Sequence, residues 1–409
     1  MFLPLIGNSQ VTRLSPRNIL KEWNMNEYNS CNSHTITNLE VSQSQSYPII
    51  RTSKIFSSSN SLLADVIGDR NFLVFISPSI DRLYRRDISN YIKHFFAIKI
   101  NKPFVIPTGE KNKNIETVLK VCSLARAAGV ERKTIFIGIG GGILTDIVAF
   151  AASMFRRGTD CIRIGTTLIG QVDASIGIKC GVNLGKSKNL LGAFHPSYKV
   201  IIDHHFLTTL PIRHIRCGLA EIIKLAIVRD NTLFKLVEEN YQGFVENRVG
   251  TNASIVIVDR SITRMVSELA TNPTEKNLKR VVDFGHTFSP HIEAASNFQI
   301  SHGEAVGMDL ALTCVIANKL GYLSSNSLHR ILHLLKKVGL PLLDEIINPT
   351  ELYSSLHHIQ LHRGNMLNLP IPTSIGTCEF IDDLKQLPFS IVDDALCFLD
   401  KHSKRIRNE

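Results

Sequence analysis

Three residues able to bind a catalytic metal lie in largely apolar segments of the sequence. Glu221 and Lys224 stand three residues apart in GLAEIIK (218–224), a spacing that places both on one face of a helix. Two histidines follow, His286 in DFGHTF and His302 in SHGEA. Two histidines and one glutamate, with a coordination position left open, form a ligand set typical of catalytic zinc.

Composition and spacing alone do not single out this triad. A buried histidine is more often satisfied by hydrogen bonds than by a metal, and Lys224 alone would balance the charge of Glu221. The sequence also offers other residues that can bind a metal: His204, His205, His291, Glu293 and Glu304.

A second group of polar residues stands among small and apolar ones between residues 173 and 189. The group includes Asp173, Ser175, Lys179, Asn183, Lys188 and Asn189. A solvated surface would mix acids with the lysines, whereas here segments such as Ile-Gly-Ile and Leu-Leu-Gly separate them. We interpret the group as the wall of a pocket for a phosphorylated, hydroxyl-rich substrate.

Gly140, Gly141 and Gly142 join a predicted strand to a predicted helix. Glycines at such a junction let the backbone approach a diphosphate, whose charge the helix N-terminal amides favour. Tight packing of strand against helix explains them equally well, because the usual dinucleotide fingerprint is not matched. Asp146 is placed either to bind cofactor hydroxyls or to favour the helix start. The polar loop 107–113 is either a ribose or adenine contact or an ordinary surface loop.

The elements that carry these residues alternate between strands and helices in the first half of the chain. Short apolar runs predict buried strands at 72–76, 104–106, 134–137 and 161–164. Apolar spacings of three and four predict helices at 114–128 and 143–155. This alternation is typical of a parallel sheet with helices on both faces.

From about residue 207 the strand signals fade and long helical patterns follow. Helices are predicted at 218–228, 232–239, 254–269, 303–320 and 328–337. We therefore expect an irregular extension over 1–45, an α/β nucleotide-binding domain over 46–206, and a mainly α-helical metal- and substrate-binding domain over 207–409.

Charge and composition restrict the function further. The 409 residues carry a net charge of +10, but the positive residues are dispersed and aromatic residues are few. An anionic small substrate explains this charge balance as well as nucleic acid does, and we expect no nucleic-acid partner. No apolar run reaches the roughly 18–20 residues that cross a bilayer, and no signal-peptide pattern is present. We expect a cytoplasmic protein with no membrane partner.

Several segments, taken in order, resemble the dehydroquinate-synthase-like sugar-phosphate cyclases over residues 70–380. They are GGGILTD (140–146), RRGTDCIRIGTTLIGQVDASIGIK (156–179), KNLLGAFHP (188–196), GLAEIIK (218–224), DFGHTF (283–288) and HGEAVGMD (302–309). The resemblance implies zinc, or cobalt in its place, on Glu221, His286 and His302. It implies NAD near Glu110, Lys113, Gly140, Gly141, Gly142, Asp146, Thr166 and Thr167. It implies substrate contacts at Asp173, Lys179, Lys188, Asn189 and Lys224.

The resemblance also bears on assembly and on the reaction. Arg157 matches an arginine that reaches the substrate phosphate across a dimer interface, so a homodimer is expected. The implied reaction is redox-neutral: transient oxidation by NAD, phosphate elimination, re-reduction and intramolecular aldol closure. His195 either relays protons or holds the turn Phe-His-Pro.

A few positions separate the branches of this family. Dehydroquinate synthase, whose substrate carries a carboxylate, normally has LNLGHTFGH where this chain has VDFGHTFSP. Asp283 thus replaces an asparagine and Pro290 a histidine. Met265 replaces a lysine, and Lys279 an arginine, although Arg280 is adjacent. Losing a cation and gaining an acid makes a poor carboxylate pocket.

These changes, with HRGNMLNLPIPTSIG (362–376), resemble the branch that forms C7 cyclitols from sedoheptulose 7-phosphate. The resemblance implies that Asp283 and Arg363 also contact substrate. Dehydroquinate synthase, a related polyol dehydrogenase and a non-catalytic binding protein are the alternatives. One position departs from the family: Ser77 stands where related chains carry an acid for the adenosine ribose, and Asp81 lies four residues further on. This departure leaves the preference between NAD and NADP open.

Overall fold

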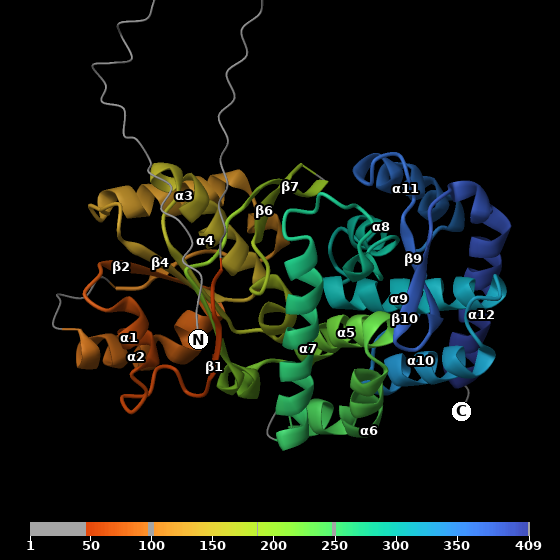
Figure 1. Cartoon of the computed structure of the whole chain (residues 1–409), viewed down its shortest axis with the longest axis horizontal. Coiled ribbons are helices and arrows are strands. Elements are labelled where there is room, and N and C mark those ends of the chain that lie inside the picture. Colours follow the sequence, from red (N-terminus) through yellow and green to blue (C-terminus); the bar gives the residue numbers. More distant parts are fainter. Residues whose placement is uncertain (1–45, 97–101, 186, 248–250, 408–409) are drawn as a thin grey trace, which may run out of the picture. The chain divides into compact units, whose positions relative to one another are not determined.

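Six parallel strands form the central sheet of the protein (Figure 1). The computed structural model describes residues 46–96, 102–185, 187–247 and 251–407; the extension predicted over 1–45 lies outside them. The sheet order is β1-β8-β5-β4-β2-β3. The strands are β1 (Ile49–Thr52), β2 (Phe72–Ile76), β3 (Phe104–Val105), β4 (Ile135–Gly140), β5 (Cys161–Gly165) and β8 (Lys199–Asp203).

Alternating side chains of these strands face two separate apolar layers. On β2, Val74 and Ile76 pack toward α1 (Leu62–Ile67) and α2 (Pro78–Phe95). Leu73 and Phe75 pack toward α3 (Ile115–Ala127) and α4 (Gly142–Met154). Figure 1 shows these two helix pairs on opposite sides of the sheet. The predicted parallel sheet with helices on both faces is therefore confirmed.

The sheet reverses its direction of growth beside β2. From β2 the chain crosses to β3 at the edge, then returns to β4 on the other side of β2. In open parallel sheets, ligands bind outside the carboxyl ends of the strands at such a switch point. Here that position is flanked by Ser77 after β2 and by the glycine turn after β4.

An antiparallel hairpin, β6 (Lys179–Leu184) and β7 (Ser187–Phe194), lies outside the central sheet and packs on α4. Sequence patterns did not reveal it, because glycines and lysines break the apolar alternation that marks a strand. The hairpin carries Lys179, Lys188 and Asn189, so it places most of the predicted lysine-rich pocket wall.

Helices make up most of the second half of the described chain. They are α5 (Ile212–Arg229), α6 (Asn231–Asn247), α7 (Asn252–Thr271), α8 (Ser289–Ala295), α9 (His302–Lys319), α10 (Ser325–Val338), α11 (Pro349–His362) and α12 (Phe389–Arg407). An antiparallel pair, β9 (Leu369–Ser374) and β10 (Thr377–Ile381), lies among them. α5 is buried along most of its length and packs against α6 and α9.

The predicted helical character of this half is confirmed, and the β9–β10 pair is an addition to it. The domain boundary at 206/207 stays a prediction; it falls between the end of β8 and the start of α5. Among the described helices, none is both long and apolar enough to span a bilayer.

Candidate active site

Glu221, His286 and His302 converge although they come from three separate elements. Glu221 lies on α5, His286 precedes α8, and His302 begins α9. One ligand atom of each residue lies within 4.8 Å of the others. His302 Nε2 is 3.1 Å and His286 Nε2 is 3.8 Å from Glu221 Oε1. Within the described parts of the chain, this is the group of three whose geometry can hold a metal ion.

Close packing of α9 on α5 brings His302 to Glu221. A Cβ atom at Gly303 would lie 2.3 Å from Cys217 Cα, so a side chain there would push the two helices apart. The glycine after His302 is thus required by this approach. The start of α9 is further fixed by a capping box in which Ser301 and Glu304 exchange hydrogen bonds.

The segment that carries His286 is held by two buried side chains. Asp309 Oδ2 on α9 accepts backbone hydrogen bonds from Thr287, Phe288 and Ser289 at 2.6–2.9 Å. Arg363 donates to the carbonyl oxygen of His286 (3.3 Å) and to the hydroxyl of Thr287 (3.2 Å). Nδ1 of His286 lies 3.2 Å from the carbonyl oxygen of Phe284, which leaves Nε2 free to face Glu221.

The charges around the triad fit a cation. Glu221 is fully buried, and within the described residues neither of its oxygens has a hydrogen bond of normal geometry, although Lys224 Nζ lies 2.5 Å from Oε2. Burial would raise the pKa of Glu221, but Lys224 and the two histidines hold it well below its usual range. Burial lowers the pKa of His286 to about 3, as a neutral metal ligand requires.

His302 differs from His286 because it faces two carboxylates. Burial alone would lower the pKa of His302, but Glu293 and Glu221 raise it to about 10. His302 Nδ1 lies 3.0 Å from Glu293 Oε1. A carboxylate behind a histidine ligand is a common arrangement at metal sites. His302 must therefore lose the proton on Nε2 to bind a metal ion, and Glu221, His286 and His302 then offer the donor set of a zinc or cobalt site.

The other metal-binding candidates of the sequence have separate roles. Glu304 pairs with Arg213 at 2.6 Å, and His204 lies 3.8 Å from Asp259. His205 and His291 are not part of the group of three. Glu293 is the exception, because it contacts the triad without being one of its members.

Beside the triad lies a cavity of about 510 Å³. Its charged and amide lining residues are Asp146, Asp173, Lys179, Asn189, Lys224, Glu275, Arg280, Asp283 and His286. Lys224 is buried, and its Nζ lies between Glu221 and Asp173, 3.7 Å from Asp173 Oδ2. Burial would lower the pKa of Lys224, but these two acids raise it, so the ammonium remains charged. Burial raises the pKa of Asp173.

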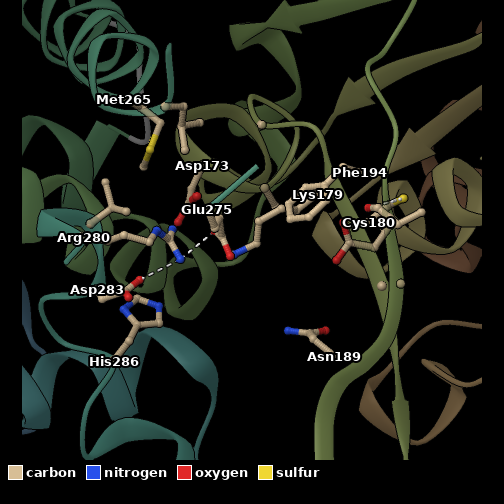
Figure 2. Close-up of a pocket in the computed structure, with 18 of the residues that line it drawn as sticks. Asp173, Lys179, Cys180, Asn189, Phe194, Met265, Glu275, Arg280, Asp283 and His286 are labelled. Carbon is tan, nitrogen blue, oxygen red and sulfur yellow. Dashed lines mark hydrogen bonds and ion pairs between the residues drawn. The ribbon is translucent and has the colours of Figure 1, made fainter. Parts of the chain in front are cut away.

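A chain of ion pairs crosses the cavity wall (Figure 2). Glu275 Oε1 lies 2.5 Å from Lys179 Nζ and 2.6 Å from Arg280 Nη1. Arg280 also lies 3.1 Å from Asp283 Oδ1. Lys279 stands at the sequence position of an arginine in dehydroquinate synthase. In this structure it pairs with Asp382 at 2.5 Å. Of the two neighbouring cations Lys279 and Arg280, Arg280 is therefore the one that faces the cavity, where it is paired with Glu275 and Asp283.

The predicted cofactor residues surround the switch point. Lys113 Nζ lies 2.7 Å from Asp146 Oδ2 and 2.6 Å from Asn189 Oδ1, and Glu110 accepts from Asn183 at 2.9 Å. Asp146 is therefore engaged by Lys113, in addition to lining the cavity.

The glycine turn is closely packed. Cβ atoms at Gly140, Gly141 and Gly142 would lie 2.5–2.9 Å from Leu144, Thr167 and Ala174. The backbone nitrogen of Thr166 donates to the carbonyl of Gly140 at 2.9 Å. Tight packing thus accounts for these glycines, and their contact with a cofactor stays a prediction.

The residue that follows β2 is Ser77, where related chains carry an acid. Ser77 caps α2 by accepting from the backbone nitrogen of Ile80 at 3.3 Å. Asp81 pairs with Arg85 at 2.5 Å, so its carboxylate is engaged by a neighbour on α2.

Four of the predicted catalytic and substrate-binding residues lie outside the cavity lining. His195 Nε2 lies 3.0 Å from the carbonyl oxygen of Thr159. Arg363 binds the His286 segment, and Lys188 pairs with Glu293 at 2.5 Å. Arg157 is exposed, with a left-handed backbone (φ 66°). For these residues the predicted roles remain untested.

Sequence reasoning missed a buried cation that organises the loop before β6. Arg163 is fully buried on β5 and donates to the carbonyl oxygens of Gly177, Lys179 and His195 at 3.1–3.2 Å. An arginine inside the apolar run CIRIG was the signal that could have revealed it.

The fold and the site together define a protein whose parallel sheet has a switch point and whose Glu-His-His group lies beside a cavity. Residues 103–217 match the family model "3-dehydroquinate synthase N-terminal", and 218–360 match "3-dehydroquinate synthase C-terminal". The chain belongs to the 3-dehydroquinate synthase family.

Three proteins similar to this chain show which members of the family it resembles. A 2-epi-5-epi-valiolone synthase of Streptomyces glaucescens is 39% identical over 88% of this chain and 92% of its own. A demethyl-4-deoxygadusol synthase of Trichormus variabilis is 36% identical over 83% of this chain and 84% of its own. The solved 2-epi-5-epi-valiolone synthase of Streptomyces hygroscopicus, with NAD⁺ and Zn²⁺ bound, is 36% identical. Its TM-score is 0.85 over 90% of this chain and 100% of that one.

Proposed function

We propose that this protein is a zinc- and NAD-dependent sugar-phosphate cyclase that converts sedoheptulose 7-phosphate to 2-epi-5-epi-valiolone with release of phosphate. In this proposal it is a carbon–oxygen lyase. The observation that carries the choice of substrate is the position of Asp283. Its carboxylate lines the cavity beside His286 and neutralises Arg280. An acid at this position disfavours a substrate carboxylate and can accept hydrogen bonds from hydroxyls.

When bound, zinc would acidify a substrate hydroxyl and NAD would accept and return a hydride. Glu221, His286 and His302 would hold the metal, and the residues around Lys113 and Asp146 would hold the cofactor. Asp173 and Asp283 orient substrate hydroxyls in this proposal.

Lys179, Lys224 and Asn189 bind the substrate phosphate. Lys179 is paired with Glu275, so the phosphate must replace this carboxylate on entering. Lys224 stays charged in its buried position, where a cation acts strongly on a leaving phosphate.

We also propose that the protein is a homodimer in which Arg157 completes the partner's phosphate site. Its support is the family resemblance together with the position of Arg157, which is exposed and lies outside the cavity lining. A long, exposed cation in this position is free to reach a second subunit.

The function is tested by offering three substrates to the zinc-loaded protein with NAD. Sedoheptulose 7-phosphate should release phosphate without accumulating NADH. Phosphate release from the 3-deoxy heptulosonate phosphate of aromatic biosynthesis alone would instead identify a dehydroquinate synthase. Steady NADH production from glycerol or a related polyol would identify a dehydrogenase. Product analysis distinguishes 2-epi-5-epi-valiolone from 2-epi-valiolone and from demethyl-4-deoxygadusol.

A further inference from the structure

Glu293 is a buried acid on α8 whose two oxygens are used by different elements. Oε1 lies 3.0 Å from His302 Nδ1 at the start of α9, and Oε2 lies 2.5 Å from Lys188 Nζ on β7. Its side chain is only 5% exposed. A buried carboxylate satisfied by one histidine and one lysine ties together the two side chains that it contacts.

The contact fixes which nitrogen of His302 faces the metal position. With Nδ1 donating to Glu293, Nε2 is directed at Glu221 Oε1, 3.1 Å away. His286 is oriented by a backbone carbonyl, that of Phe284, which is neutral. His302 alone of the two is held by a carboxylate, and a carboxylate makes its imidazole a stronger ligand.

Lys188 supplies the positive charge that Glu293 needs when buried. Its ammonium also lies 3.5 Å from Glu110 Oε1 and 5.7 Å from the centre of the Phe298 ring. Lys188 does not line the cavity. It therefore contacts the acid behind the metal site rather than the cavity where substrate would bind.

We propose that Glu293 is a positioning residue that holds His302 in the geometry for metal binding, and that Lys188 acts with it by holding its carboxylate in place. The proposal rests on the metal site of the proposed function. It assigns to Lys188 a role in metal affinity, in place of the substrate contact implied by the family resemblance.

The direct test is Glu293→Gln, measured as the zinc affinity of metal-depleted, full-length protein in competition with a chromophoric chelator. The amide removes the charge and cannot accept from both partners. Loss of such an outer carboxylate typically weakens metal binding about 10- to 100-fold. Glu304→Gln is the matched control. It makes the same substitution two residues from His302, but Glu304 contacts Arg213 and Ser301 and no member of the triad. Its zinc affinity should stay close to that of the unaltered protein.

Thermal unfolding of each metal-free variant separates weak metal binding from loss of the fold. If Glu293→Gln does not fold, Glu293→Asp retains the charge with a shorter reach and should show a smaller loss of affinity. The visible spectrum of the cobalt-loaded protein should also change in either Glu293 variant and not in Glu304→Gln. Lys188→Met should weaken zinc binding as well.

Unchanged zinc affinity in the Glu293 variants, or an equal loss in Glu304→Gln, would overturn the proposal for Glu293. Unchanged affinity in Lys188→Met would overturn the part assigned to Lys188. These measurements need no substrate, so a protein that proved not to be a cyclase would still give a clear result.

Discussion

The guanidinium of Arg280 lies 3.1 Å from the carboxylate of Asp283, on the wall of the cavity that His286 also lines (Figure 2). A substrate carboxylate would need net positive charge here. In this protein two cations, Lys179 and Arg280, are paired with two acids, Glu275 and Asp283, so the wall suits neutral hydroxyl groups.

Asp283→Asn should lower kcat/KM for sedoheptulose 7-phosphate about 10- to 100-fold. The reason is the loss of charge-assisted hydrogen bonds worth about 1.5–3 kcal/mol. Zinc content should not change, because Asp283 is not a member of the triad. Asp382→Asn, which breaks the surface pair with Lys279, serves as control and should retain full activity. An Asp283→Asn variant with unaltered kinetics would refute the role given to this acid.

Mixed dimers test the placement of Arg157. Arg157→Ala and Lys224→Met should each be nearly inactive alone. If Arg157 serves the partner's site, a hybrid dimer of the two variants contains one intact site. Random mixing makes about half of the dimers hybrids, so about a quarter of full activity should return. Co-expression of two differently tagged chains and a phosphate-release assay measure this recovery. No recovery in the purified hybrid would mean that Arg157 does not act across an interface.

Arg163→Met should destabilise the protein by about 3 kcal/mol or more, because it leaves buried carbonyl oxygens without their charged donor. The free energy of unfolding from urea titration is the readout. Arg85→Met removes an arginine from an exposed pair with Asp81 on α2, and its cost in stability should be only a small fraction of that. Equal effects of the two substitutions would contradict the organising role of Arg163.

Asp230 gives a pH-dependent contribution to stability. Burial would raise its pKa, but Arg260 and Arg264 hold the pKa at about 2, below that of an unfolded aspartate. The carboxylate therefore stabilises the fold above pH 4, by about 2 kcal/mol, and this contribution is lost as the pH falls toward 2.

The comparison with Asp230→Asn isolates this contribution. Urea unfolding should show the variant less stable at pH 6, with the difference from the unaltered protein shrinking between pH 4 and pH 3. A difference that is constant over this range would show that the stabilisation does not depend on the charge of Asp230.

Local sequence patterns were sufficient to predict the bounds of strands that are continuously apolar. The runs at 72–76 and 161–164 became β2 and β5 almost residue for residue, because buried parallel strands are continuously apolar. The β6–β7 and β9–β10 pairs were missed, since glycine, lysine and proline interrupt their alternation.

Sequence patterns also could not predict where the side chains of the site point. Spacing could not tell that Glu293 contacts His302 whereas Glu304, nearer in sequence, turns to Arg213. Nor could it tell that Arg280 rather than Lys279 faces the cavity, because they are neighbours just before a short 3₁₀ turn (Val281–Asp283). Family motifs pointed to Glu221, His286 and His302, whose side chains lie close together in the structure. The residues around them depend on tertiary packing that no local pattern encodes.

The most direct measurement is a simultaneous record of phosphate and NADH during turnover of sedoheptulose 7-phosphate by the zinc-loaded protein with NAD. The account predicts one phosphate released per sugar consumed, no net absorbance gain at about 340 nm, and a cyclic C7 product by NMR. Lasting NADH formation, or no phosphate release from this sugar under conditions where the 3-deoxy heptulosonate phosphate is turned over, would contradict it.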